Sequence, residues 1–273
     1  MDFQALLIPA AILGGLGILF GGVLGYAARI FHVEVDERVG AVREYLPGAN
    51  CGGCGYPSCD ALAEAIVADG VPVSSCMVID QENLALAAEV MGQEAGLVER
   101  KKAVVQCLGN DKNSPPRFSY EGVDTCKATS TVGGGTKGCR YACLGHGDCI
   151  RSCAFGAITM GEFGIPIINF DKCTGCGACQ RTCPREVIGL LPMSSHVMVT
   201  CRTKESGRDV RQVCQRGCIT CRLCERSCPE GAISCDSGIA VIDHEKCTNC
   251  RQCVERCPSK CIDIFGPASV LID

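Results

Sequence analysis

The sequence of 273 residues contains no tryptophan, and aromatic residues make up only 5% of it. Its formal net charge is −4, and no cluster of basic and aromatic side chains stands out along the chain. Proteins that bind nucleic acids usually present basic surfaces with stacking aromatic groups. The composition therefore argues against a nucleic-acid partner.

Signatures of nucleotide, flavin and catalytic-triad sites are also missing. The segment 133–138 matches G-x-G-x-x-G, but it lacks the strand, the helix and the acidic residue that a dinucleotide site requires. The four histidines are scattered along the chain. We expect no catalytic residue and no nucleotide site in this protein.

Cysteine, in contrast, is abundant, with 26 residues. Secreted disulfide scaffolds with such a cysteine content are much shorter chains, and ordinary cytosolic enzymes contain few thiols. The cysteine spacings are those of metal clusters, which favours a reducing compartment.

The N-terminal segment Phe3–Ala28 has 26 residues without a charge, enough to cross a bilayer. No Lys or Arg precedes this segment, and it is too long for the apolar core of a cleaved signal peptide. Arg29, Arg38 and Arg43 all follow it, so we expect a single-pass anchor with the bulk of the chain on the cytoplasmic side of the plasma (inner) membrane.

Three cysteine runs have the spacing C-x2-C-x2-C-x3-C-P of bacterial ferredoxins. The first three thiolates of such a run bind one [4Fe-4S] cluster, and the fourth binds the neighbouring cluster. Structural zinc sites have two cysteine pairs separated by a longer loop, which does not fit these runs. The runs comprise Cys173, Cys176, Cys179 and Cys183; Cys218, Cys221, Cys224 and Cys228; and Cys247, Cys250, Cys253 and Cys257.

A fourth run has wider gaps and ends in Ala154 instead of proline. It lies one repeat upstream of Cys173, where a partner run is required, so we expect it to complete a pair of two-cluster modules. The expected cross-ligated sets are Cys139, Cys143 and Cys149 with Cys183; Cys173, Cys176 and Cys179 with Cys153; Cys218, Cys221 and Cys224 with Cys257; and Cys247, Cys250 and Cys253 with Cys228.

A fifth group precedes these modules and consists of Cys51, Cys54, Cys59 and Cys76. Four thiolates in one compact segment suit a single [4Fe-4S] cluster, and zinc is the alternative for this group. The glycines between its first two cysteines leave backbone amides free to approach the cluster. Five [4Fe-4S] clusters are therefore expected in total.

Six cysteines remain. Cys235 and Cys261 occupy positions that are apolar in the other repeats, so we expect them to be packing residues. Cys107, Cys126, Cys201 and Cys214 either hold a sixth cluster or remain reduced thiols, because spacing alone does not assign connectivity. About 20 iron atoms per chain would exclude the sixth cluster, whereas about 24 would require it.

These patterns predict an α+β protein with a single N-terminal transmembrane helix, a small helical [4Fe-4S] domain and two tandem bacterial-type ferredoxin modules. We expect the anchor at 1–32, the small domain at 33–110 and the modules at 111–200 and 201–273. The residues 60–67 and 81–90 are predicted helices, and 166–170 and 239–242 are predicted strands. The polar segment 111–116 is the predicted linker.

The anchor, the segment Cys51-Gly-Gly-Cys54-Gly-Tyr-Pro-Ser-Cys59 and the tandem ferredoxin runs together resemble the B subunit of the Rnf complex. This resemblance covers essentially the whole chain and implies a subunit of a membrane-bound ferredoxin:NAD oxidoreductase that translocates Na⁺ or H⁺. It also implies that soluble ferredoxin donates the electrons and that partner subunits carry the flavin and NAD sites.

The resulting hypothesis is an electron relay with a docking end in the ferredoxin modules and an exit near the Cys51 group. Two alternatives stay open at this point. One is a membrane-anchored polyferredoxin of a hydrogenase or formate dehydrogenase type complex, which would not need the Cys51 group. The other is a zinc-bound scaffold without redox function.

Overall fold

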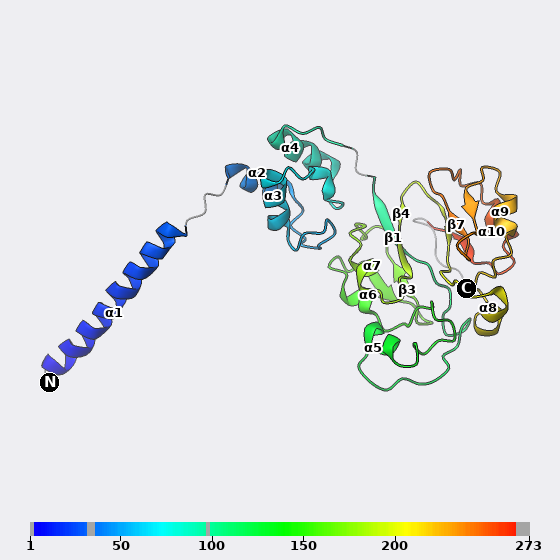
Figure 1. Ribbon diagram of the computed structural model, residues 1–273, viewed down its shortest axis with the longest axis horizontal. Helices are drawn as coiled ribbons and strands as arrows, with labels where there is room; N and C mark the ends of the chain where they lie inside the picture. The colour runs from blue at the N-terminus through cyan, green and yellow to red at the C-terminus, as the bar shows by residue number, and fades with distance from the viewer. Residues whose placement is uncertain (1–2, 32–35, 97–98, 266–273) are drawn as a thin grey trace.

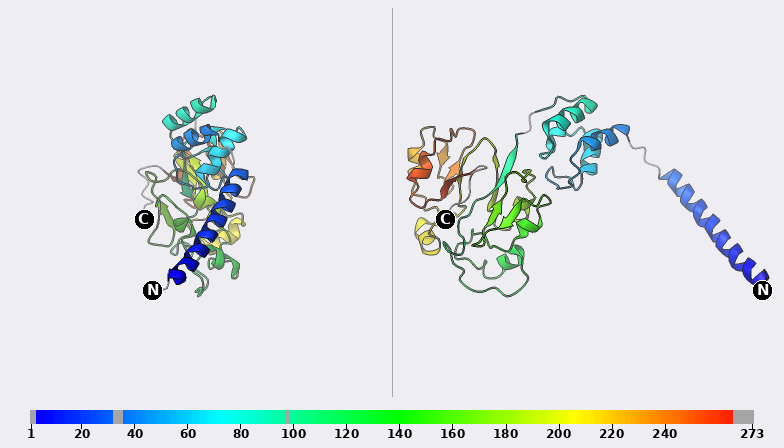
Figure 2. Two further views of the ribbon diagram at one scale, coloured as in Figure 1. Left: turned by 90° about the vertical axis from the view of Figure 1, so that its left-hand side faces the viewer. Right: turned by 180° about the vertical axis from the view of Figure 1, so that it is seen from behind.

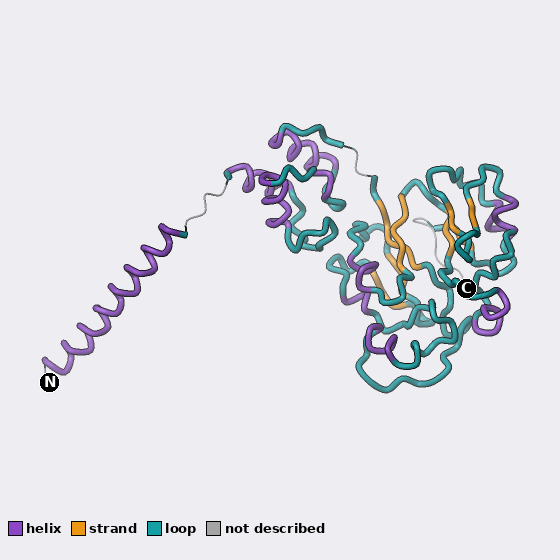
Figure 3. Tube along the Cα trace, in the orientation of Figure 1, coloured by secondary structure: helices purple, strands orange, loops and turns teal. Residues whose placement is uncertain are grey.

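The computed structural model describes residues 3–31, 36–96 and 99–265. The described part consists of a long N-terminal helix, a small helical domain and a cysteine-rich region in which short strands alternate with short helices (Figure 1). Loops make up much of the cysteine-rich region (Figure 3).

Helix α1 (Phe3–Ile30) projects away from the rest of the described chain in the right-hand view of Figure 2. Within the described residues, the segment Ala11–Ile30 is the one stretch with the length and apolar composition of a membrane span, and none of it is buried against the protein. A helix that is apolar on all sides and packs against nothing in its own chain suits a lipid or subunit environment.

The small domain contains α2 (Glu37–Tyr45), α3 (Cys59–Ala68), the 3₁₀ turn η1 (Val73–Ser75) and α4 (Gln81–Met91). The predicted helices at 60–67 and 81–90 are thus confirmed. Ser58 and Asp80 cap α3 and α4 because their side chains accept hydrogen bonds from free backbone N–H groups of the first turn. Leu62, Ile66 and Leu84 form the buried centre of this domain.

The first part of the cysteine-rich region contains β1 (Lys101–Val105), α5 (Cys126–Thr131), α6 (Asp148–Arg151), β2 (Ile158–Met160), β3 (Pro166–Ile168), α7 (Ala178–Thr182) and β4 (Ile188–Pro192). Strands β1 and β4 form one antiparallel sheet, and β2 and β3 form another. We call this part the first module.

The second module repeats this plan with β5 (Val197–Val199), α8 (Gly207–Val213), α9 (Leu223–Ser227), β6 (Ile233–Ser234), β7 (Val241–Ile242), α10 (Gln252–Arg256) and β8 (Ile262–Ile264). Here β5 pairs with β8 and β6 with β7, again antiparallel. In both modules, the strand that follows the last cysteine of the ferredoxin runs pairs with a strand that precedes the first one.

Two strands that precede the expected module boundaries pair with strands of the modules that follow them. Strand β1 lies before the expected boundary at 110, yet it pairs with β4 of the first module. Strand β5 lies before the expected boundary at 200, yet it pairs with β8. The predicted linker at 111–116 packs against the second module, because the Ser114 hydroxyl donates a hydrogen bond to the Val213 carbonyl at 2.8 Å.

Candidate metal centres

All 26 cysteines have free thiols, and most of them are buried or half-buried. They also form much of the interior, since cysteines account for a large part of the core of each module. A core built from thiols instead of branched aliphatic side chains suits a protein that folds around a bound group.

The three complete runs share one backbone conformation. The residues immediately before and after the second cysteine have positive φ, a region that glycine tolerates best. Gly175 and Gly177 occupy these positions in the first module, and the second module has Thr220 and Arg222, then Asn249 and Arg251. These turns wrap each loop around one point, and the third cysteine follows in a short helix, α7, α9 or α10.

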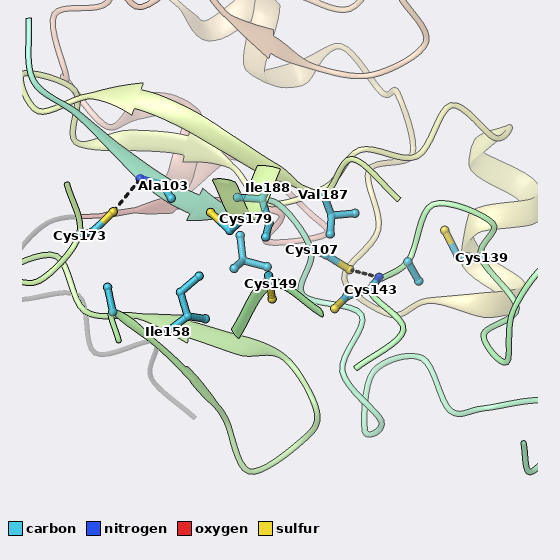
Figure 4. Close-up of a cluster of buried hydrophobic side chains, with 13 residues drawn as sticks. Ala103, Cys107, Cys139, Cys143, Cys149, Ile158, Cys173, Cys179, Val187 and Ile188 are labelled. Atoms are coloured by element: carbon cyan, nitrogen blue, oxygen red, sulfur yellow. Dashed lines mark hydrogen bonds between the residues drawn. The ribbon is translucent and has the colours of Figure 1, made fainter. Parts of the chain in front are cut away.

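In the first module, Cys173, Cys176 and Cys179 line one cavity together with Cys153 from the preceding run. This is the set that the cross-ligation rule predicts. Backbone amides also approach these sulfurs, since Ala157 donates to Cys153 Sγ at 3.4 Å and Ala103 donates to Cys173 Sγ at 3.5 Å (Figure 4).

The second module has the expected groupings as well. Cys218, Cys221 and Cys224 line a cavity with Cys257. Cys253 neighbours Cys247 and Cys250, and Cys228 belongs to the same core. The amide of Ala232 donates to Cys228 Sγ at 3.3 Å, and that of Cys261 donates to Cys257 Sγ at 3.4 Å.

Cys235 and Cys261 are buried, each 2% exposed, and both line the cavity of the Cys218 group. Cys261 is more than a packing residue, because its sulfur lies 3.5 Å from Cys257 Sγ. The Cys261 thiol has a single S–H, and its hydrogen bond to Cys257 lowers the pKa of Cys257 to about 6. The thiol therefore stabilises negative charge on one of the expected ligands.

The Cys51 group forms its own centre in the small domain. Cys59 begins α3, and its amide donates to the Asn50 side chain at 2.8 Å. Cys76 follows η1 and has Cys54 and Cys59 as neighbouring thiols. Gly53 contacts the first module, because a Cβ atom at this position would lie 2.7 Å from the Cys176 carbonyl oxygen.

The fourth run departs from expectation. Cys143, Cys149 and Cys183 line a common cavity as expected, but the fourth cysteine there is Cys126. Cys139 instead lines a different cavity, because the chain turns between Cys139 and Cys143 at the contact with the second module. No spacing signal identifies Cys126, which begins α5 and lies 17 residues before Cys143.

Cys139 shares its cavity with three of the unassigned thiols, Cys107, Cys201 and Cys214. The amide of Cys143 donates to Cys107 Sγ at 3.4 Å, and Figure 4 shows this bond. All 26 cysteines except Cys235 and Cys261 thus fall into groups of four.

Burial shapes the acidity of these thiols. It raises the pKa of Cys143 and Cys149 to about 12, with neighbouring thiols adding to the effect. Thiols of this kind stay protonated at neutral pH unless a metal stabilises the thiolate.

The groups also fit a cluster better than a single ion. Among the residues that the structure describes, no three His, Cys, Asp or Glu side chains lie close enough to hold one metal ion. Zinc would require four sulfurs about 2.3 Å from a single point. Sulfurs spread around a cavity suit an iron-sulfur cube, which is larger.

Three segments match known family models. Residues 46–78 match a model for an Fe-S cluster, residues 166–189 match a 4Fe-4S binding domain, and residues 217–261 match a 4Fe-4S dicluster domain. Iron-sulfur clusters are therefore the cofactors of this chain.

Several curated proteins are similar over most of the chain. The B subunit of the Na⁺-translocating ferredoxin:NAD⁺ oxidoreductase complex of Acetobacterium woodii is 43% identical over 89% of this chain and 73% of its own length. The B subunit of the ion-translocating oxidoreductase complex of Methanosarcina acetivorans is 42% identical over 96% of this chain and 99% of its own. The B subunit of the proton-translocating ferredoxin:NAD⁺ oxidoreductase complex of Clostridium ljungdahlii is 41% identical over 84% and 81%. Similarity at this level over nearly complete chains, together with the cysteine groups described above, shows that this chain belongs to the B subunits of the Rnf-type ion-translocating oxidoreductase complexes.

Proposed function

We propose that this chain is the electron-relay subunit of a membrane complex, which passes electrons from reduced ferredoxin through [4Fe-4S] clusters toward NAD-reducing and ion-translocating partners. The observation that carries the proposal is the succession of four-cysteine groups from the small domain to the second module. The names of the relatives from Acetobacterium and Clostridium support ferredoxin and NAD as the terminal reactants.

Five clusters follow from the groups that contain the expected ligands, with Cys126 taking the place of Cys139. Each cluster, when bound, supplies one-electron chemistry, and the protein positions it and tunes its potential through N–H···S hydrogen bonds. The proposed sets are Cys51, Cys54, Cys59 and Cys76; Cys153, Cys173, Cys176 and Cys179; Cys126, Cys143, Cys149 and Cys183; Cys218, Cys221, Cys224 and Cys257; and Cys228, Cys247, Cys250 and Cys253.

The small domain is the proposed exit for electrons. Its Cys51 carbonyl accepts a hydrogen bond from Arg181 Nη2 of the first module at 3.2 Å, beside the Gly53 contact with Cys176. Cys176 is also a neighbouring thiol of Cys51. The Cys51 group and the Cys173 group therefore lie side by side, which suits direct electron transfer between them.

The second module is the proposed entrance. Basic residues surround its ferredoxin runs, among them Arg226, Arg251 and Arg256, and they would attract an acidic electron carrier. Helix α1 would anchor the chain in the plasma membrane, with the modules in the cytoplasm as the basic residues after the span indicate. Integral membrane subunits and flavin- or NAD-binding subunits would then receive the electrons. We also propose that this chain is an α+β protein whose two modules begin at β1 and β5.

Anaerobic purification tests the proposal. We expect a brown protein that contains iron and sulfide in equal amounts and whose clusters are reduced by reduced ferredoxin. A colourless, zinc-loaded protein would refute it. Co-purification with hydrogenase or formate dehydrogenase subunits, instead of flavin- and NAD-binding ones, would favour the polyferredoxin alternative.

A further inference from the structure

The cavity between the two modules is lined by Cys107, Cys139, Cys201 and Cys214. We propose that these four cysteines hold a sixth [4Fe-4S] cluster, which joins the two modules. This inference rests on the proposed function, since it adds one more relay centre to the same chain. The proposed set differs from the one that the sequence left unassigned, because it contains Cys139 in place of Cys126. Cys139 is therefore no longer a proposed ligand in the Cys143 group.

The internal repeat supports this set of ligands. Cys107 lies two residues after β1, and Cys201 lies two residues after β5. Cys139 and Cys214 each precede a cysteine of the next group by four residues, Cys143 and Cys218 respectively. Each module therefore contributes two thiols from equivalent positions, as a site at the interface of two repeats requires.

The hydrogen bonds follow the same repeat. Cys107 Sγ accepts from the amides of Cys143 and Gly109, both at 3.4 Å. Cys201 Sγ accepts from the amide of Cys218 at 3.3 Å. Bonds of this type also reach Cys153, Cys228 and Cys257. Amides directed at sulfur stabilise thiolate charge and are the usual surroundings of cluster ligands.

Positive charge near the cavity suits a negatively charged cluster. Lys137 is 5% exposed, and its ammonium group lies 2.5 Å from Asp111 Oδ1. Lys137 and Arg216 both oppose the increase that burial causes in the pKa of Cys214. The Lys137–Asp111 pair is formally neutral, so Arg216, which lines the cavity itself, is the main positive charge beside the four thiols.

Hydrogen bonds between the two modules surround the cavity. The amide of Gln215 donates to the Asn113 carbonyl at 3.0 Å, and Arg202 Nη1 donates to Gln106 Oε1 at 2.9 Å. Thr203 of the second module and Cys139 of the first both line the cavity. The four sulfurs are thus held by contacts between the modules.

A cluster at this place would close a gap in the relay. Cys107 neighbours Cys143 of the first module, and Cys201 neighbours Cys218 of the second. Each of these partners belongs to another proposed cluster. The sixth cluster would therefore accept an electron from one module and pass it to the other without a change in protein conformation.

The test begins with anaerobically purified, full-length wild-type protein, for which six clusters predict about 24 iron atoms per chain. We expect Cys214→Ala to lose about four iron atoms, together with one electron paramagnetic resonance signal of the reduced protein. Leu86→Ala, which shortens a partly exposed side chain of α4 that belongs to no proposed set, should lose none. About 20 iron atoms in the wild type, unchanged by Cys214→Ala, would overturn the sixth cluster and leave the relay intact, whereas a wild type without iron would overturn the relay itself.

Double variants identify the ligand set. Cys139→Ala/Cys214→Ala should lose about four iron atoms, as each single variant does, because both residues serve one cluster. Cys126→Ala/Cys214→Ala should lose about eight, because these two residues serve different clusters. The opposite pattern would return Cys139 to the Cys143 group and refute the proposal. Retention of the remaining cluster signals in every variant shows that the protein still folds.

Discussion

At the scale of single residues, the repeat pattern predicts that Cys261 is a packing residue, whereas the structure places its thiol against a proposed cluster ligand. Replacing Cys261 with alanine removes the hydrogen bond to the Cys257 sulfur, a proposed ligand of the Cys218 cluster. A lost hydrogen bond of about 1 kcal/mol lowers a one-electron potential by roughly 40 mV, because the reduced cluster is the more negative form. We expect redox titration of Cys261→Ala to show this negative shift for one cluster.

The variant should keep its full iron content, since alanine occupies the equivalent positions 157 and 232. Cys261→Ser, which retains a donor, serves as the control and should restore most of the potential. An unchanged potential in Cys261→Ala would mean that this thiol only fills space.

Acid stability depends on the same residue-scale chemistry. Protons displace iron from a thiolate more readily when the thiol pKa is high. Burial raises the pKa of two ligands of the Cys143 cluster, Cys143 and Cys149, to about 12. In the Cys218 cluster, burial raises the pKa of Cys224 alone to about 12, and the hydrogen bond from Cys261 lowers that of Cys257 to about 6. As the pH falls from 8, we therefore expect the Cys143 cluster to be lost at a higher pH than the Cys218 cluster.

Spectra of the two clusters, distinguished by variants that lack one of them, would follow this loss. Simultaneous release of both clusters, or the reverse order, would contradict the assigned pKa directions.

At the scale of elements, the sequence predicts what is local. The spacing C-x2-C-x2-C specifies the loop around a cluster, and the left-handed residues around Cys176, Cys221 and Cys250 follow from it. The pairing of β1 with β4 and of β5 with β8 joins segments far apart in the chain, so no short pattern announces it. The presence of Cys126 instead of Cys139 in the Cys143 group could not be predicted from spacing for the same reason. It depends on contacts between segments that are far apart in the sequence.

The contact of the small domain with the first module depends on Gly53. An added Cβ would approach the Cys176 carbonyl oxygen to 2.7 Å, so Gly53→Ala should weaken this contact by about 1–3 kcal/mol. A cost of about 1.4 kcal/mol lowers the equilibrium constant for docking roughly tenfold. We expect slower electron transfer from the first module to the Cys51 cluster, measured by rapid freezing after reduction by ferredoxin.

Gly40→Ala in α2 is the matched control, because nothing lies within 4 Å of its added Cβ. This variant should transfer electrons at the wild-type rate. Equal rates in Gly53→Ala would mean that electrons do not pass through this contact.

At the scale of the whole molecule, the order of the domains arranges the cysteine groups as a path for electrons. The anchor, the small domain, the first module and the second module follow one another in sequence and also in space (Figure 1). Contacts between thiols of successive groups connect Cys51 with Cys176, and Cys149 with Cys179. In the proposed function, an electron that enters at the second module would move toward the membrane as it moves toward the N-terminus.

This path predicts how a break near the membrane end behaves. Cys54→Ala removes a ligand of the Cys51 cluster, which is the last centre before the partner subunits in the proposed order. In the assembled complex, we expect ferredoxin-driven NAD reduction to fall below about a tenth of the wild-type rate. Without the Cys51 cluster, electrons would have to pass directly from the first module to the partner subunits over a longer distance. Ferredoxin should still reduce the clusters of both modules to their normal extent, which electron paramagnetic resonance would detect. The combination of intact reduction and lost turnover distinguishes a broken exit from a misfolded chain. If NAD reduction survives in Cys54→Ala, electrons leave from one of the modules, and the small domain serves only to attach them to the membrane complex.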